Sequence, residues 1–159
     1  MQITPFQVTT IVGQHGCKAD AKGRINIPTA LKNKLLPFMN EEFVIKRAVF
    51  KDCLELHPKV KFDEVMQKVM RKGGRGKQFD VFLMKFTAGL KEVPIDADTG
   101  RLQIPKDLFE FAGIDKEVVL NAQHDKIEIW NKDKYESVLD SMSDEDYEAM
   151  AEDIFDADE

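Results

Sequence analysis

Two arginines, each preceded by a glycine, are the side chains of this sequence best suited to bind an anion. One lies in Lys22-Gly23-Arg24 and the other in Thr99-Gly100-Arg101. A guanidinium group forms paired hydrogen bonds with a phosphate or with the edge of a guanine, because its N–H groups form a planar fork. Lys18 and Lys22 stand beside Arg24, where lysines would neutralise phosphates. These residue types therefore favour a phosphate-bearing partner.

Acidic residues accompany both arginines. Asp20 precedes Arg24 by four residues, across a turn in which Gly23 supplies a backbone conformation that other residues resist. Asp20 could accept hydrogen bonds from the turn amides or hold the Arg24 fork. The second turn, 96–101, is one residue longer, so that either Asp96 or Asp98 could be the counterpart of Asp20. Because the first turn is basic and the second holds two acids, we expect the first to bind the anion.

Catalytic and metal-binding patterns are weak. His15, His57 and His124 have no obvious nucleophile partner, and nothing resembles a glycine-rich nucleotide loop. Cys17 and Cys53 bring the number of potential zinc ligands near two of these histidines to four, but the spacing follows no familiar zinc pattern. We therefore expect no enzyme, no cofactor and no metal, and we interpret both cysteines as free thiols in a reducing cytoplasm.

The Gly-Arg motif occurs twice because the chain contains an internal repeat. The pattern Gly-Arg-apolar-polar-Ile-Pro-x-x-Leu begins at Gly23 and again at Gly100, an offset of 77 residues. Two further matches follow downstream in the same order, at offsets of 75 and 73 residues. Loops tolerate such small deletions. The repeat covers most of residues 15–62 and 91–135, and it predicts one structural unit used twice.

Both units should contain strands and helices in the same order. Ile25 and Ile27 alternate with a polar residue, as in a strand, and Pro28 either stops that strand or opens the next helix. Apolar residues at helical spacing predict the helices. The expected elements after this strand are a helix at 29–36, strands at 43–47 and 53–57, helices at 62–70 and 79–86, strands at 90–95 and 101–104, a helix at 106–112, strands at 117–121 and 126–130, and a helix at 132–142.

Charge is distributed unevenly along the chain. Residues 140–159 contain ten acidic and no basic residues, whereas residues 1–139 carry a net charge of +4. A mildly basic body is compatible with a polyanionic partner. Ser143 could cap a last helix, and the tail is either a frayed, solvated terminus or a helix docked on a neighbour. No run of 18 or more apolar residues is present, and the start of the chain does not resemble an export signal.

The repeated motif identifies a family. The pattern Asp-x-x-x-Arg followed by apolar-x-Ile-Pro, present twice in a chain of this length, resembles MraZ, a family of bacterial transcriptional regulators. The stretches 17–24 and 126–130 are similar to that family as well, and the resemblance spans residues 15 to about 139. It implies a tandem pair of AbrB-like, swapped-hairpin units that bind promoter DNA as a ring-shaped oligomer. The family is associated with the control of cell-division and cell-wall genes.

We therefore expect an α+β fold in which two AbrB-like units form a pseudo-two-fold β-barrel with flanking helices. The expected first unit is 8–70, followed by a basic link and connecting helix at 71–89, a second unit at 90–142 and an acidic tail or helix at 143–159. The basic link could touch DNA, form a solvated loop or pair with acids of a neighbouring subunit. Its cationic residues are Lys68, Arg71, Lys72, Arg75 and Lys77.

The expected function is sequence-specific DNA binding that represses the chain's own promoter in a cell-division and cell-wall gene cluster. The expected partners are double-stranded DNA with direct repeats and further copies of the chain, at the nucleoid in the cytoplasm, with no membrane or small-molecule substrate. The alternative is a structural or protein-interaction module that lacks DNA affinity. The expected DNA-binding residues are Lys18, Lys22, Arg24 and Arg101, and the turns are expected to depend on Asp20, Gly23, Asp96 and Gly100.

Overall fold

Each repeat folds into a strand, a tight turn, a second strand, a short helix, a β-hairpin and a projecting helix. The computed structural model describes residues 11–156, so that the first residues of the expected unit 8–70 and the end of the acidic tail lie outside it. The elements of the first unit are β1 (Ile11–Lys18), β2 (Arg24–Asn26), α2 (Thr29–Leu35), the 3₁₀ helix η1 (Leu36–Phe38), β3 (Phe43–Arg47), β4 (Leu54–Pro58) and α3 (Lys59–Gly73).

The second unit repeats this order after a helix that has no place in the repeat. That helix, α4 (Lys77–Phe86), follows the glycine-rich break in the basic link. The elements of the second unit are β5 (Lys91–Val93), β6 (Arg101–Gln103), α5 (Lys106–Phe111), β7 (Glu117–His124), β8 (Lys126–Asn131), α6 (Lys132–Asp140) and α7 (Asp144–Asp156). The helices and strands predicted from Ile25 onward are present, with ends that differ by a few residues, whereas β1 and η1 had not been predicted. Pro28 and Pro105 precede α2 and α5, so each proline opens a helix.

The two units exchange strands. The six-stranded sheet has the order β1-β7-β8-β4-β3-β5, and all of its neighbouring strands are antiparallel. The first strand of each unit thus pairs with the third strand of the other unit, while β4 pairs with β8 and β2 with β6. Interchanging the two units maps every pairing onto another one. The pairing therefore has the pseudo-two-fold symmetry that the sequence repeat predicted.

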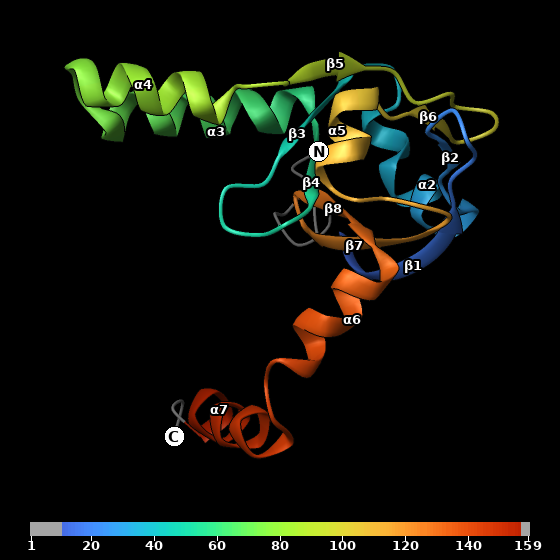
Figure 1. The fold of residues 1–159 in the computed structure, drawn as a ribbon, viewed down its shortest axis with the longest axis vertical. Coiled ribbons are helices and arrows are strands. Elements are labelled where there is room, and N and C mark those ends of the chain that lie inside the picture. Colours follow the sequence, from blue (N-terminus) through green and yellow to red (C-terminus); the bar gives the residue numbers. More distant parts are fainter. Residues whose placement is uncertain (1–10, 157–159) are drawn as a thin grey trace, which may run out of the picture.

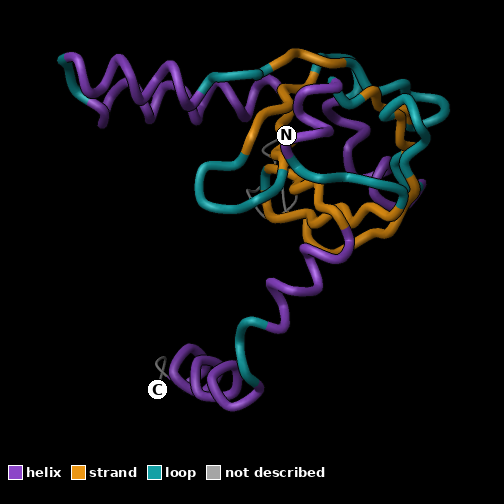
Figure 2. Tube along the Cα trace, viewed as in Figure 1, coloured by secondary structure: helices purple, strands orange, loops and turns teal. Residues whose placement is uncertain are grey.

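The predicted β-barrel does not close within residues 11–156. β1 and β5 lie at opposite edges of the six-stranded sheet, and β2 and β6 form a separate two-stranded ladder. Single bridges, Ala19 to Ile25 and Ile95 to Leu102, are the remaining links between each first strand and this ladder. The tight turns at 20–23 and 96–100 follow the first strands, and the ladder packs across the core from the six-stranded sheet. Figure 2 shows the strands gathered in the body of the molecule.

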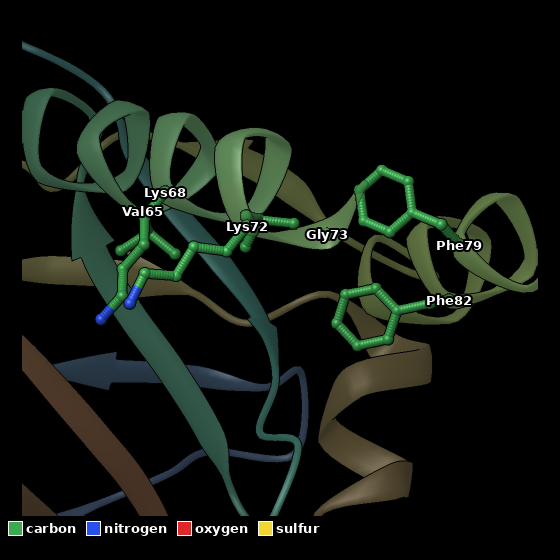
Figure 3. Close-up of a pocket in the computed structure, with 7 residues that line it drawn as sticks. Val65, Lys68, Lys72, Gly73, Phe79 and Phe82 are labelled. Carbon is green, nitrogen blue, oxygen red and sulfur yellow. The ribbon is translucent and has the colours of Figure 1, made fainter. Parts of the chain in front are cut away.

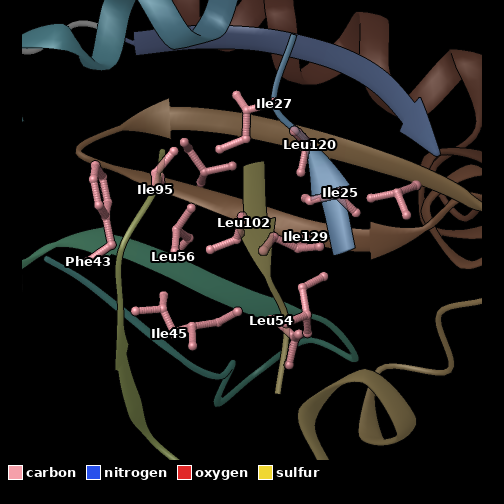
Figure 4. Close-up of a cluster of buried hydrophobic side chains, with 14 of the residues drawn as sticks. Ile25, Ile27, Phe43, Ile45, Leu54, Leu56, Ile95, Leu102, Leu120 and Ile129 are labelled. Carbon is pink, nitrogen blue, oxygen red and sulfur yellow. The ribbon is translucent and has the colours of Figure 1, made fainter. Parts of the chain in front are cut away.

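The core fills the space between the sheet and the ladder. Ile25 and Leu102 of the ladder are about 1% and 0% exposed, and they face Leu54, Leu56 and Ile129 of the sheet (Figure 4). Both units contribute to this single hydrophobic cluster. Because a core built from one unit of this size would be marginal, the exchange of strands enlarges the core that the two units share.

Two helical extensions project from the body. Figure 1 shows α3 and α4 folded against one another on one side, and α6 followed by α7 on another. Ser143 accepts a hydrogen bond from the amide of Asp146 (3.1 Å), so the predicted cap of α7 is present. The apolar side chains of α7 remain exposed, with Phe155 about 77% accessible. The tail is therefore helical over Asp144–Asp156, and within residues 11–156 the apolar stripe of this helix is not buried against the body.

Candidate nucleic-acid interface

The ladder of β2 and β6 presents one polar face to solvent. Arg24 is paired with Gln103 and Asn26 with Arg101, on either side of the central Ile25–Leu102 pair. Because successive side chains of a strand point to opposite faces, all four polar residues lie on the face opposite the buried isoleucine and leucine. Arg24 is half-buried and the other three are exposed. We call this outward face the ribbon face; it consists of Arg24, Asn26, Arg101 and Gln103.

The first turn holds Arg24 in a defined position. Asp20 accepts hydrogen bonds from the amides of Lys22 and Arg24 (both 2.9 Å) and from Nε of Arg24 (2.7 Å). Both roles considered for Asp20 therefore occur together. The Arg24 amide and guanidinium lower the pKa of Asp20, so the carboxylate stays charged at neutral pH. Because the ion pair uses Nε, the two terminal nitrogens of the guanidinium retain their N–H groups for an incoming partner.

The hydrogen bonds of the second turn identify the aspartate that corresponds to Asp20. The amide of Asp96 donates to the carbonyl of Arg101, as the amide of Asp20 does to that of Arg24 (both 3.0 Å). The Asp96 carboxylate accepts from the amides of Asp98 and Thr99 (both 2.9 Å), and these two hydrogen bonds lower its pKa. Asp96 is thus the counterpart, in a turn lengthened by one residue. Within residues 11–156 Arg101 has no ion pair, so its position is less restrained than that of Arg24.

The two motif glycines fit the units together. Gly23 and Gly100 have φ angles of +79° and +75°, which L-residues rarely adopt. The carbonyl of Gly100 accepts from the amide of Ile27 (2.8 Å), and that of Gly23 accepts from the amide of Ile104 (2.9 Å). A Cβ atom on Gly100 would lie 2.7 Å from the Ile27 carbonyl oxygen. The Gly-Arg motif therefore both shapes the turn and brings each unit against the other.

Three of the four predicted DNA-binding residues meet at one hollow. A depression of about 190 Å³ is lined by Lys18, Ala19, Asp20, Arg24, Asn26 and Arg101. Lys22 lies apart from it, beside a separate depression of about 420 Å³ that Lys106 and Glu110 also line. The side chain of Gln103 donates to the carbonyl of Lys22 (2.7 Å), which joins the first turn to β6. The hollow thus combines cations from both units, Lys18 and Arg24 from the first and Arg101 from the second.

Asn26 and Gln103 were missed in the sequence as candidate contact residues. Each occupies the polar position of the repeated Gly-Arg-apolar-polar-Ile pattern, two residues after its arginine. Their spacing could have identified them, because residues two apart in a strand lie on the same face, and each of these residues follows its arginine by two. The spacing does not indicate that the two strands pair with one another, and only that pairing assembles a four-residue face.

The other candidate sites do not assemble. Burial, with a smaller contribution from acidic neighbours, raises the pKa of Cys53 to about 12 and that of Cys17 to about 11, so both thiols are protonated at neutral pH. Within residues 11–156 no group of three or more His, Cys, Asp and Glu side chains is placed to share a metal ion. None of the helices in this range combines the length and the apolar character needed to cross a membrane.

Comparison with known proteins adds independent evidence. The sequence profile of the MraZ family, whose description also notes a likeness to antitoxins, matches the chain twice, over residues 11–78 and 86–158. These two matches correspond to the two structural repeats described above.

Relatives cover nearly the whole chain. Transcriptional regulator MraZ of Christiangramia forsetii is 47% identical over 91% of this chain and 92% of its own length. The protein of the same name in Flavobacterium psychrophilum is 45% identical, covering 92% of both chains, and that of Cytophaga hutchinsonii is 32% identical over 80% of this chain and 83% of its own. All three are described as transcriptional regulators. The repeated profile match and these identities show that the chain belongs to the MraZ family of transcriptional regulators.

Proposed function

We propose that this chain is a sequence-specific DNA-binding protein that contacts double-stranded DNA through the ribbon face. The observation that carries the proposal is that Arg24, Asn26, Arg101 and Gln103 share one outward face of a two-stranded antiparallel ladder. A two-stranded β-ribbon fits the major groove of B-DNA. Arginine pairs with guanine, and asparagine and glutamine pair with adenine, through two hydrogen bonds each. The ribbon face therefore has the residue types that read base edges.

Lys18 supports the same role by its position. It ends β1, is exposed and lines the hollow that Arg24 and Arg101 share. A lysine at the edge of a base-reading surface neutralises backbone phosphates without selecting a sequence. We assign Lys22 to an adjacent phosphate, because it lies on the exposed first turn but outside the hollow. We assign Asp20, Gly23, Asp96 and Gly100 to maintaining the two turns, an assignment supported by the turn hydrogen bonds and the positive φ angles.

One ribbon face carries too few cations to bind tightly alone. Several copies in one assembly would raise the effective concentration of each face over DNA with repeated sites. We therefore propose a closed, ring-shaped oligomer that binds direct repeats in the chain's own promoter and represses it, within a gene cluster for cell division and the cell wall and at the nucleoid. The exchange of first strands and the repeated core support the finer interpretation as two AbrB-like swapped-hairpin units. The unit boundaries at 70, 89 and 142 remain part of this proposal.

The test is DNA binding by Arg24 variants, measured by fluorescence anisotropy over a range of salt concentrations with promoter DNA and a scrambled duplex. Arg24→Ala should lower specific affinity by about 1–3 kcal/mol per engaged face. Arg24→Lys should restore the charge but little of the specificity, since a lysine lacks the fork. Arg101→Ala should have a smaller effect, because its side chain is less restrained. Lys132→Ala, which removes a cation on α6 away from the ribbon face, is the matched control.

A protein-interaction module without DNA affinity is the second candidate. The acids beside Arg101 and the strongly acidic α7 favour it. Wild-type protein that binds promoter and scrambled duplexes equally weakly at physiological salt would support this candidate. An Arg24→Ala variant with unchanged specific affinity would overturn the assignment of the ribbon face.

A further inference from the structure

An apolar groove lies along the hairpin formed by α3 and α4. Its volume is about 560 Å³, and Figure 3 shows the rings of Phe79 and Phe82 beside the end of α3. Gly73 allows this approach, because a Cβ atom there would lie 1.8 Å from the Phe79 ring. Val65 and Val69 complete the apolar lining, and Lys68 and Lys72 stand on it with exposed side chains. The groove is thus an apolar surface with a cationic border.

The C-terminal helix α7 has the complementary character. Tyr147, Met150, Ile154 and Phe155 lie on one face at helical spacing, and all four are more than half exposed. α7 contains seven acidic residues and no basic one. At 100° per residue, Glu148 and Glu152 follow one border of this apolar stripe. An isolated helix of this length is marginal in water, so α7 needs a surface to pack against.

The two surfaces carry charges of opposite sign. Residues 59–86, which include α3 and α4, carry eight basic and three acidic side chains, against seven acids on α7. In Figure 1 α7 lies well away from α3 and α4 of its own chain, at the end of the separate extension formed by α6. The complementary helix that the groove lacks is therefore one that a second copy of the chain can supply.

We propose that α7 of one copy docks in the α3–α4 groove of a second copy, with its apolar stripe on Phe79 and Phe82. Glu148 and Glu152 then face Lys68 and Lys72. The contact joins two different surfaces, so only a closed assembly, such as the proposed ring, leaves no groove and no helix unoccupied. This inference rests on the proposed oligomer and names its interface, and it does not depend on DNA binding.

Charge exchange provides the test. Lys68→Glu/Lys72→Glu (the groove variant) and Glu148→Lys/Glu152→Lys (the helix variant) each place like charges against one another. Each variant alone should show a smaller mass by light scattering, with at least about a tenfold rise in the protein concentration needed for assembly. An equimolar mixture should recover the wild-type mass, because each groove then meets a helix of opposite charge. Lys132→Glu/Lys134→Glu, on α6, controls for the change in net charge of the groove variant.

The outcomes separate this interface from the DNA proposal. Circular dichroism confirms that each variant is folded before its mass is interpreted. If either folded variant alone keeps the wild-type mass, or if the mixture stays dissociated, the docking proposal is overturned. A monomeric wild-type protein in which the helix variant changes only the melting temperature would show docking within one chain and would also overturn it. Arg24→Ala should keep the wild-type mass while losing specific DNA binding, so that failure of one proposal leaves the other intact.

Discussion

An ion-pair cluster surrounds Glu55, and we expect it to stabilise the folded chain near neutral pH but not in acid. Glu55 lies on β4 with about 15% of its side chain exposed. His57 Nε2 and Lys126 Nζ lie 3.1 Å from its carboxylate oxygens, and Lys46 Nζ lies 3.9 Å away. Burial opposes ionisation of this carboxyl, but the hydrogen bonds and positive charges outweigh it and lower the pKa of Glu55 from 4.5 to about 2.

The free energy follows from the shift. Each pKa unit corresponds to about 1.4 kcal/mol, so Glu55 contributes about 3 kcal/mol to the free energy of unfolding. The folded protein has the lower pKa, which means that the unfolded chain binds the proton first as the pH falls. The contribution is therefore complete above the unfolded-state pKa of 4.5, and it is lost as the pH falls from 4.5 to about 2.

Glu55→Gln removes the charge and keeps the side-chain shape. We expect it to cost about 3 kcal/mol near neutral pH and progressively less on acidification, until the two proteins converge near pH 2. Urea unfolding from about pH 7 to about pH 2 measures the difference. Glu110→Gln, at an exposed position on α5, is the matched control. A constant difference between Glu55→Gln and wild type at every pH would refute the reasoning, because it would show that the carboxylate's charge is not the source of the stability.

Three further predictions concern glycines and a cap. Gly100→Ala should lower the free energy of unfolding by at least about 2 kcal/mol in a urea titration, because it adds a Cβ at φ +75° that lies 2.7 Å from the Ile27 carbonyl oxygen. Ser143→Ala should remove about 1 kcal/mol from α7 and reduce amide-exchange protection in that helix while the body is unaffected. Gly73→Ala should displace the Phe79 ring and increase proteolytic cleavage between α3 and α4; unchanged cleavage would contradict the close packing seen there.

Local features of the structure were predictable from the sequence because they depend on neighbouring residues. The alternation around Ile25 predicted a strand with Ile25 on one face and Asn26 on the other, and helical spacing located α3, α4 and α7. Ser143 caps α7 as predicted, because the cap needs only the next three residues. The repeat also led to the MraZ family, since a motif that occurs twice is more specific than either copy.

The correspondence between the two turns could be assigned only from the tertiary structure. The spacing allowed either Asp96 or Asp98 to correspond to Asp20, and the backbone hydrogen bond between Asp96 and Arg101 decided between them. Closure of the predicted barrel is not seen within residues 11–156, where the ladder of β2 and β6 is joined to the first strands through single bridges, and this feature too required the tertiary structure. Neither property is encoded in the identity of adjacent residues alone.

The candidate interface depends both on the local sequence of each strand and on the tertiary structure that pairs the strands. The sequence by itself determined which residues point outward on each short strand, because side chains alternate along a strand. It did not determine that β2 pairs with β6, which lies 77 residues further along the chain. Strand pairing at that distance is selected by burial of Ile25 and Leu102 in a core to which both units contribute. Only the folded chain therefore brings Arg24 and Arg101 together on one face.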